Sequence, residues 1–200
     1  MESLPTSKVL ELDRVFLLGS SHERGALHVS PEQTFEDPFA VLTGEADIRE
    51  PVILRQESGT VPRDFVGTTH ACLFLVSTHV VSSLRSYKVS GWKTYPVEVV
   101  LKDGRSLKDF HGLVVTGVCG GIDNSRSTRV WRNPVSPLGE RYEAWMGLYF
   151  DPSTWDGSDI FVPKSTGYIF VVEAVKQIFE RENITNVRFV PITAVERMML

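Results

Sequence analysis

The chain of 200 residues is 42% hydrophobic and 23% charged, a composition typical of a globular protein with a sizeable core. Its formal net charge of −4 argues against a dedicated nucleic-acid binder, which usually gathers a basic excess into a patch. Residues 1–8 lack the basic start and apolar centre of a signal peptide, and no apolar run approaches the length of a membrane span. We therefore expect one domain, residues 1–200, in the cytoplasm, with no membrane and no nucleic acid as partner.

The first part of the chain, residues 1–56, predicts an irregular, β-rich lobe. Short apolar runs at 9–12 and 15–18 favour an initial strand or hairpin. Prolines and a glycine then interrupt the chain, so that only Phe39 to Leu42 and Val52 to Leu54 are apolar enough to be strands.

A strand-helix-strand unit is predicted for residues 157–192. An apolar strand at 168–172 leads into an amphipathic helix from Glu173 to about Glu182, and a second strand follows at 186–192. The apolar stripe of the helix consists of residues at i, i+3 and i+4, namely Val175, Ile178 and Phe179.

A second unit with the same pattern is predicted for residues 64–97, because a shift of ninety-five positions places Asp64 on Asp159 and Pro96 on Pro191 without a gap. Its helix should run from Thr78 to about Ser86, with Ser77 as the N-cap. The two units are either a pseudo-repeat or two ordinary strand-helix-strand units that look alike at this level of detail.

The region between the units, residues 98–156, is predicted to be a central β region with one long loop. Asp103-Gly104 indicates a tight hairpin turn, and Leu113 to Cys119 is apolar enough for a central strand covered on both faces. Ile122 to Glu143 should be a surface loop, and a strand should return over 142–150. The whole chain therefore predicts an α+β fold with a mixed, mostly antiparallel sheet and two principal helices.

Candidate catalytic and metal-binding groups are sparse. His70 and Cys72 lie two apart, but catalytic pairs are usually assembled from distant parts of a chain. The five histidines and two cysteines form no CxxC, HxxxH or HExxH spacing, and Gly117 to Gly121 lacks the spacing of a phosphate-binding loop. Four aspartates near turns could form a glycosidase-like pair but fit turn capping better: Asp123, Asp151, Asp156 and Asp159. We expect no catalytic residue, no cofactor and no metal, with Cys72 and Cys119 as unreactive buried thiols.

Several segments together resemble a bacterial immunity-protein family, immunity-protein family eleven. They are Gly157 to Phe161, Tyr168 to Val172, Ile184 to Ile192, Leu73 to Ser77 and Val114 to Ser125. The resemblance covers residues 64–192 and departs from the family at the second helix, where the family more often has a serine cap.

This resemblance implies an intracellular protein that protects its producer by binding and neutralising a cognate toxin, and it carries over no catalytic residue. One alternative is an enzyme or small-ligand-binding domain with a site between the two units, and another is a scaffolding or oligomer-forming module. A large concave pocket with convergent polar groups would favour the enzyme or ligand-binding domain, whereas an exposed aromatic patch with acidic neighbours would favour the immunity protein.

The loop from Ile122 to Glu143 is the predicted toxin-binding surface. Recognition that differs between relatives needs surface that can vary without disturbing the core, and this is the longest segment without a strand or helix signal. It carries residue types that dominate binding hot spots: Arg129, Trp131, Arg132 and Tyr142. The alternative is that Trp131 folds back to cap a sheet edge.

Overall fold

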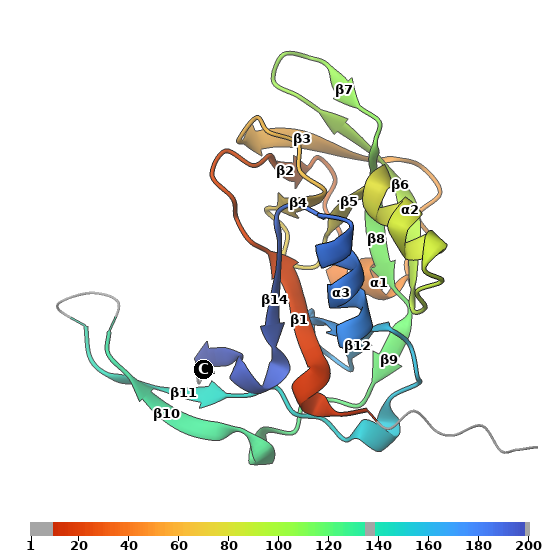
Figure 1. The fold of residues 1–200 in the computed structure, drawn as a ribbon. Coiled ribbons are helices and arrows are strands. Elements are labelled where there is room, and N and C mark those ends of the chain that lie inside the picture. Colours follow the sequence, from red (N-terminus) through yellow and green to blue (C-terminus); the bar gives the residue numbers. More distant parts are fainter. Residues whose placement is uncertain (1–9, 135–138, 199–200) are drawn as a thin grey trace, which may run out of the picture.

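The computed structural model describes residues 10–134 and 139–198, which form three sheets and three α-helices (Figure 1). The predicted α+β class is confirmed, because antiparallel pairs dominate the sheets and the two longest helices are the predicted ones. These are α2 (Thr78–Ser86) and α3 (Glu173–Arg181). The apolar tail at 199–200 and the start of the chain at 1–9 lie outside the described residues.

The first sheet has five strands and both of its faces are covered. Its strands, in spatial order, are β14 (Val187–Pro191), β1 (Val15–Ser20), β13 (Ile169–Val172), β12 (Ile160–Pro163) and β9 (Gly117–Cys119). The pairs are antiparallel except β12 with β9. Along β13, Ile169 and Val171 pack toward the helices, while Phe170 packs on the opposite face against Phe150 and Phe161.

The second sheet closes on itself. Its strands, in spatial order, are β3 (Val52–Ser58), β2 (His28–Pro31), β4 (Phe65–Thr68), β5 (Leu75–Ser77), β8 (Phe110–Val115) and β6 (Trp92–Val100), with the short β7 (Ser106–Leu107) on β6. Because β6 also pairs with β3, the first six strands form a small barrel. Side chains such as Leu54, Leu75 and Val99 fill its interior. The predicted turn at Asp103-Gly104 joins β6 to β7.

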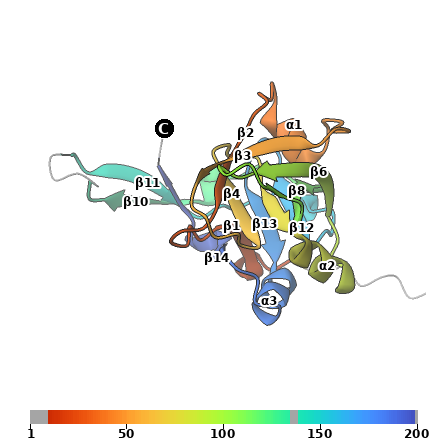
Figure 2. The same cartoon turned by 90° about the horizontal axis from the view of Figure 1, so that it is seen from above.

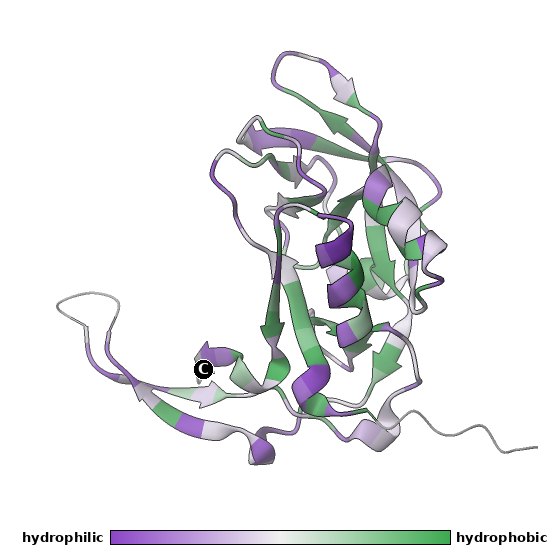
Figure 3. Ribbon diagram, viewed as in Figure 1, coloured by the Kyte–Doolittle hydropathy of each residue, from purple (hydrophilic) through white to green (hydrophobic). Residues whose placement is uncertain are grey.

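Helices α2 and α3 lie side by side over the first sheet and the barrel wall (Figures 1 and 2). Val175 and Phe179 of α3 are buried, whereas its outward side is hydrophilic (Figure 3). The predicted cap of α2 is present, since Ser77 Oγ accepts a hydrogen bond from the backbone N–H of Val80. Val172 caps α3 with no side-chain hydrogen bond.

One predicted strand is wrong, and another is confirmed only in part. Phe39 to Leu42 is part of the helix α1 (Pro38–Thr43), because Asp37 accepts hydrogen bonds from the N–H groups of Phe39 and Ala40 and Gly44 closes the helix in the left-handed region. The run from Leu113 to Cys119 is the predicted central strand, covered on both faces, only as far as Val115 in β8. Beyond Thr116 it continues as β9 at the edge of the first sheet. The start of the chain also differs, since Leu12–Arg14 is a 3₁₀ helix.

The two predicted units share one topology. Along the chain, the second unit runs β12, β13, α3 and β14, and the first unit runs β4, β5, α2 and β6. In each sheet, a strand from elsewhere in the chain lies between the last two strands of the unit. This strand is β1, between β13 and β14, in the second unit, and β8, between β5 and β6, in the first. Left-handed residues after the helices also correspond under the shift of ninety-five, because Lys88 and Asn183 have φ values of 54° and 53°. This correspondence supports the pseudo-repeat over a chance likeness.

The units are joined by a reciprocal pair of carboxylate contacts, which we call the aspartate clamps. Asp64 of the first unit accepts hydrogen bonds from the backbone N–H (3.0 Å) and hydroxyl (2.7 Å) of Thr185 in the second. Asp159 of the second unit accepts the equivalent bonds from the backbone N–H (2.9 Å) and hydroxyl (2.7 Å) of Ser90 in the first. Such an exchange, in which each half offers the same contact to the other, is the pattern of a two-fold interface.

Candidate partner-binding site

The predicted surface loop, Ile122 to Glu143, contains most of a β-hairpin, so the loop prediction is wrong at 128–132 and 142–143, which are strand. Strands β10 (Thr128–Arg132) and β11 (Tyr142–Met146) pair antiparallel, and β15 (Glu196–Met198) adds a third strand beside β11. The predicted strand over 142–150 therefore ends at Met146, where Gly147 takes a positive φ of 96°. This three-stranded arm projects from the body of the molecule (Figures 1 and 2).

The hairpin separates the four predicted contact residues onto two faces, because successive side chains of a strand point to opposite sides. In the register, Arg129 is opposite Trp145 and Trp131 is opposite Glu143, which places these four residues on one face. Arg132 and Tyr142 are opposite each other on the second face. The structure thus brings Arg129 and Trp131 together but not with Arg132 and Tyr142.

The face that carries Trp131 is exposed and held in place by its neighbours. The Trp131 side chain is 59% exposed, more than any other large hydrophobic residue in the described part of the chain. The Arg129 guanidinium lies 4.9 Å from the centre of the Trp145 ring and 3.7 Å from a carboxylate oxygen of Glu143. Trp131 does not fold back over a sheet edge, and it stands beside a cation, a carboxylate and a second indole.

The opposite face is engaged within the arm. Arg132 Nε donates a 2.7 Å hydrogen bond to a carboxylate oxygen of Glu196 on β15, which ties the hairpin to the third strand. Tyr142 is only partly exposed, and its neighbour on this face, Ala144, is fully buried. The ion pair with Glu196 suits Arg132 to holding the arm together.

Sequence reasoning missed Trp145 and Glu143 as members of the site. Trp145 lies within the strand predicted over 142–150, where Leu148 and Phe150 are fully buried and Trp145 is only partly buried. Spacing carried a usable signal, because residues 129 and 131 and residues 143 and 145 are each two apart and so share a face in any extended pairing.

The aspartates considered for catalysis have structural partners. Asp123, Asp151 and Asp156 each accept a hydrogen bond from a backbone N–H two residues ahead, which is the turn-capping arrangement. The amides of the glycine-rich segment are occupied, since Val118 N donates to Asp156 and Gly120 N donates to Thr154 Oγ1. Across residues 10–134 and 139–198, no three His, Cys, Asp or Glu side chains gather as metal ligands would.

Both cysteines are expected to react slowly with a thiol reagent in the folded protein. Burial raises the pKa of Cys119 to about 12 and also raises the pKa of Cys72, with Asp156 and Asp37 adding to the respective shifts. Since the thiolate is the reactive form, labelling at neutral pH should become fast only after denaturation. Rapid labelling of either cysteine under native conditions, followed by mass spectrometry, would contradict this expectation.

The family of the chain follows from comparison with known proteins. No helix in the described residues is both long and apolar enough to cross a membrane. No curated protein matches this sequence. The family model described as Immunity protein family (Imm11) matches residues 16–194, which include both strand-helix-strand units and the β10–β11 hairpin of the arm. The chain therefore belongs to the Imm11 immunity protein family.

Proposed function

We propose that this protein binds and neutralises a cognate bacterial toxin inside the cell that produces the toxin. Membership of the immunity protein family supports this function. The observation that carries a binding role is the exposed Trp131 face of the arm, where an indole, a guanidinium and a carboxylate stand together on paired strands. Exposed aromatic residues with an acidic neighbour are the feature expected of a protein-binding surface.

The arm suits binding because its contact residues are already ordered. Arg129 is placed by the Trp145 ring and by Glu143, so little side-chain freedom remains to be lost when a partner docks. An aromatic side chain such as Trp131 adds a large contact area with few rotatable bonds. We therefore propose the Trp131 face as the anchoring surface, with Arg129 beside it and with Arg132 and Tyr142 supporting the hairpin from its other face.

The test is a protection assay in a bacterial host. A candidate toxin domain, taken from an open reading frame that neighbours this chain's gene, would be expressed with and without the chain. Growth should be arrested by the toxin domain alone and restored by co-expression. A complex of the two purified proteins should also form in size-exclusion chromatography. Continued growth arrest with both proteins present, and no complex, would contradict the proposal.

A further inference from the structure

A groove beside α1 exposes apolar side chains at a distance from the arm. Phe39 of α1 is 45% exposed and Val118 of β9 is 51% exposed, although they are far apart in the sequence. Both line one cavity of about 450 Å³, which we call the α1 groove. Its other apolar lining includes Ala40, Val162 and Pro163.

The backbone around the α1 groove holds these two side chains outward. Helix α1 is closed at both ends by Asp37 and Gly44 and buries Val41 and Leu42, which leaves Phe39 on its outer side. On β9 the neighbours of Val118 are buried, so that Val118 points outward by strand alternation. The exposure of Phe39 and Val118 therefore follows from their positions in the regular elements α1 and β9.

An acidic segment contributes to one side of the α1 groove. The segment 32–50 contains six acidic residues and one basic residue, a net charge of −5 in a chain whose total is −4. Its one arginine, Arg49, pairs with Asp47, and Glu32 pairs with Arg55. The remaining acids have no ion pair within the described residues, and two of them line the groove: Asp37 and Glu45.

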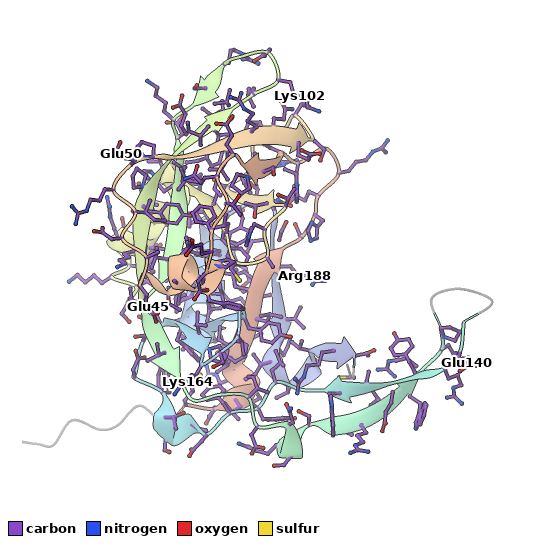
Figure 4. The ribbon with its side chains drawn as sticks, turned by 180° about the vertical axis from the view of Figure 1, so that it is seen from behind. Glu45, Glu50, Lys102, Glu140, Lys164 and Arg188 are labelled. Carbon is purple, nitrogen blue, oxygen red and sulfur yellow. The ribbon has the colours of Figure 1, made fainter. Side chains whose placement is uncertain are left out.

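One cation opposes these carboxylates. Lys164 lies on the lining of the α1 groove, and its side chain has no ion pair with any described residue. Figure 4 shows Glu45 and Lys164 on the side of the body away from the arm, with Glu140 toward the end of the arm and Arg188 between. A partner docked in the groove would meet apolar side chains together with two carboxylates, Asp37 and Glu45, and one ammonium, Lys164.

We propose that the α1 groove receives a lysine or arginine side chain from a basic surface of a protein partner. An aliphatic stem fits over Phe39, Val118 and Pro163, and a cationic head reaches the carboxylates of Asp37 and Glu45. The Phe39 ring adds a favourable face for a cation. This inference rests on the proposed function, because the partner is the toxin, and it adds that the toxin's contacting surface is basic and meets the protein at a second place besides the arm.

Binding of the inactivated toxin domain to the full-length protein, measured by calorimetry, tests the proposal. Glu45→Lys and Phe39→Ala should each weaken binding roughly ten-fold, the scale of a contact that costs more than 1 kcal/mol when removed. Lys164→Glu should strengthen binding, because it removes the opposing cation. The matched control is Glu57→Lys, which makes the same charge change on β3 at an exposed position absent from the groove lining and should leave affinity unchanged. Circular dichroism of each variant would verify its folding.

The outcomes separate this inference from the proposed function. Tight binding by the wild-type protein that none of the three groove variants alters would overturn the α1 groove as a contact and leave the toxin-binding function intact. Failure of the wild-type protein to bind the toxin domain would overturn both. Concentration-dependent dimerisation that Phe39→Ala abolishes without any change in toxin binding would show that the groove holds a second copy of the chain, and it would overturn the basic partner.

Discussion

Replacing Trp131 with alanine is expected to weaken toxin binding by about 2 kcal/mol or more, which is the usual threshold for a binding hot spot. The melting temperature should barely change, because the side chain is 59% exposed and contributes little to the core. Calorimetric titration of the toxin domain into the wild-type and variant proteins would measure the first quantity. Thermal unfolding followed by circular dichroism would measure the second.

The matched control for Trp131→Ala is Tyr87→Ala, which removes another exposed aromatic ring just beyond the C-terminal end of α2. That variant should bind the toxin like the wild type. Arg129→Ala should weaken binding alongside Trp131→Ala, whereas Arg132→Ala should act mainly through the stability of the arm. Equally tight binding after Trp131→Ala would exclude the arm as the anchoring surface, and unfolding of that variant would assign Trp131 to the structural core.

Replacing Asp64 with alanine is expected to lower the free energy of unfolding by about 3 kcal/mol, since hydrogen bonds to a charged group contribute most and their former donors would be left unpaired. The carboxylate accepts hydrogen bonds from the Thr185 amide (3.0 Å), the Thr185 hydroxyl (2.7 Å) and the Ser77 hydroxyl (2.7 Å). Urea denaturation at pH 7 would measure the change. Asp47→Ala is the control, because its ion pair with Arg49 is largely exposed and should contribute almost nothing.

The Asp64 clamp should also make stability depend on pH. Burial tends to raise the pKa of Asp64, but hydrogen bonds from Ser77 and Thr185 and the nearby His79 together lower it below its ordinary value of 3.8. A lowered folded-state pKa means that the stabilisation is complete above the ordinary value and is lost as the pH falls through the folded-state value. Asp64→Asn should therefore flatten the acid limb of the stability curve, and an unchanged acid limb would show that other carboxylates control it.

A double-mutant cycle would isolate the contact between the units. Asp64→Ala and Thr185→Val should be strongly non-additive, with a coupling energy of about 1 to 2 kcal/mol for residues in direct contact. Asp159→Ala and Ser90→Ala form the equivalent cycle in the other clamp. Additive effects in both cycles would show that the hydroxyl bonds of the clamps contribute nothing to joining the two units.

Local signals in the sequence predicted the two main helices well. Two signals span only a few residues each and can be recognised without the rest of the chain. They are the apolar stripe of α3, at Val175, Ile178 and Phe179, and the N-cap of α2 at Ser77. Helix α1 was missed although its signals were present, because Asp37-Pro38 and Gly44 bracket a run too short and apolar to distinguish from a strand. Closure of the barrel through β3 and β6 depends on pairing between distant residues, which no local pattern specifies.

Only part of the candidate site could be predicted. Trp131 and Arg129 were selected as candidate contact residues by residue type alone, because Trp and Arg are frequent in binding hot spots. The face that each residue occupies depends on the register of β10 with β11. That register places Trp145 and Glu143 on the same face as Trp131, and Arg132 and Tyr142 on the other. The α1 groove was not predicted, because Phe39 and Val118 converge only through tertiary structure.

Joining two related units in one chain permits differences that two identical subunits could not have. The pair Gly91 and Asn186, which correspond under the shift of ninety-five, both have positive φ values, of 87° and 58°. Asn186 uses its side-chain amide to donate to the Phe65 carbonyl oxygen, while its backbone N–H is held by Glu23. At Gly91 the equivalent carbonyl oxygen, that of Ile160, lies where a Cβ atom would be. A symmetric dimer would have to place one residue type in both environments, whereas this chain gives each half of its two-fold contact the residue that fits.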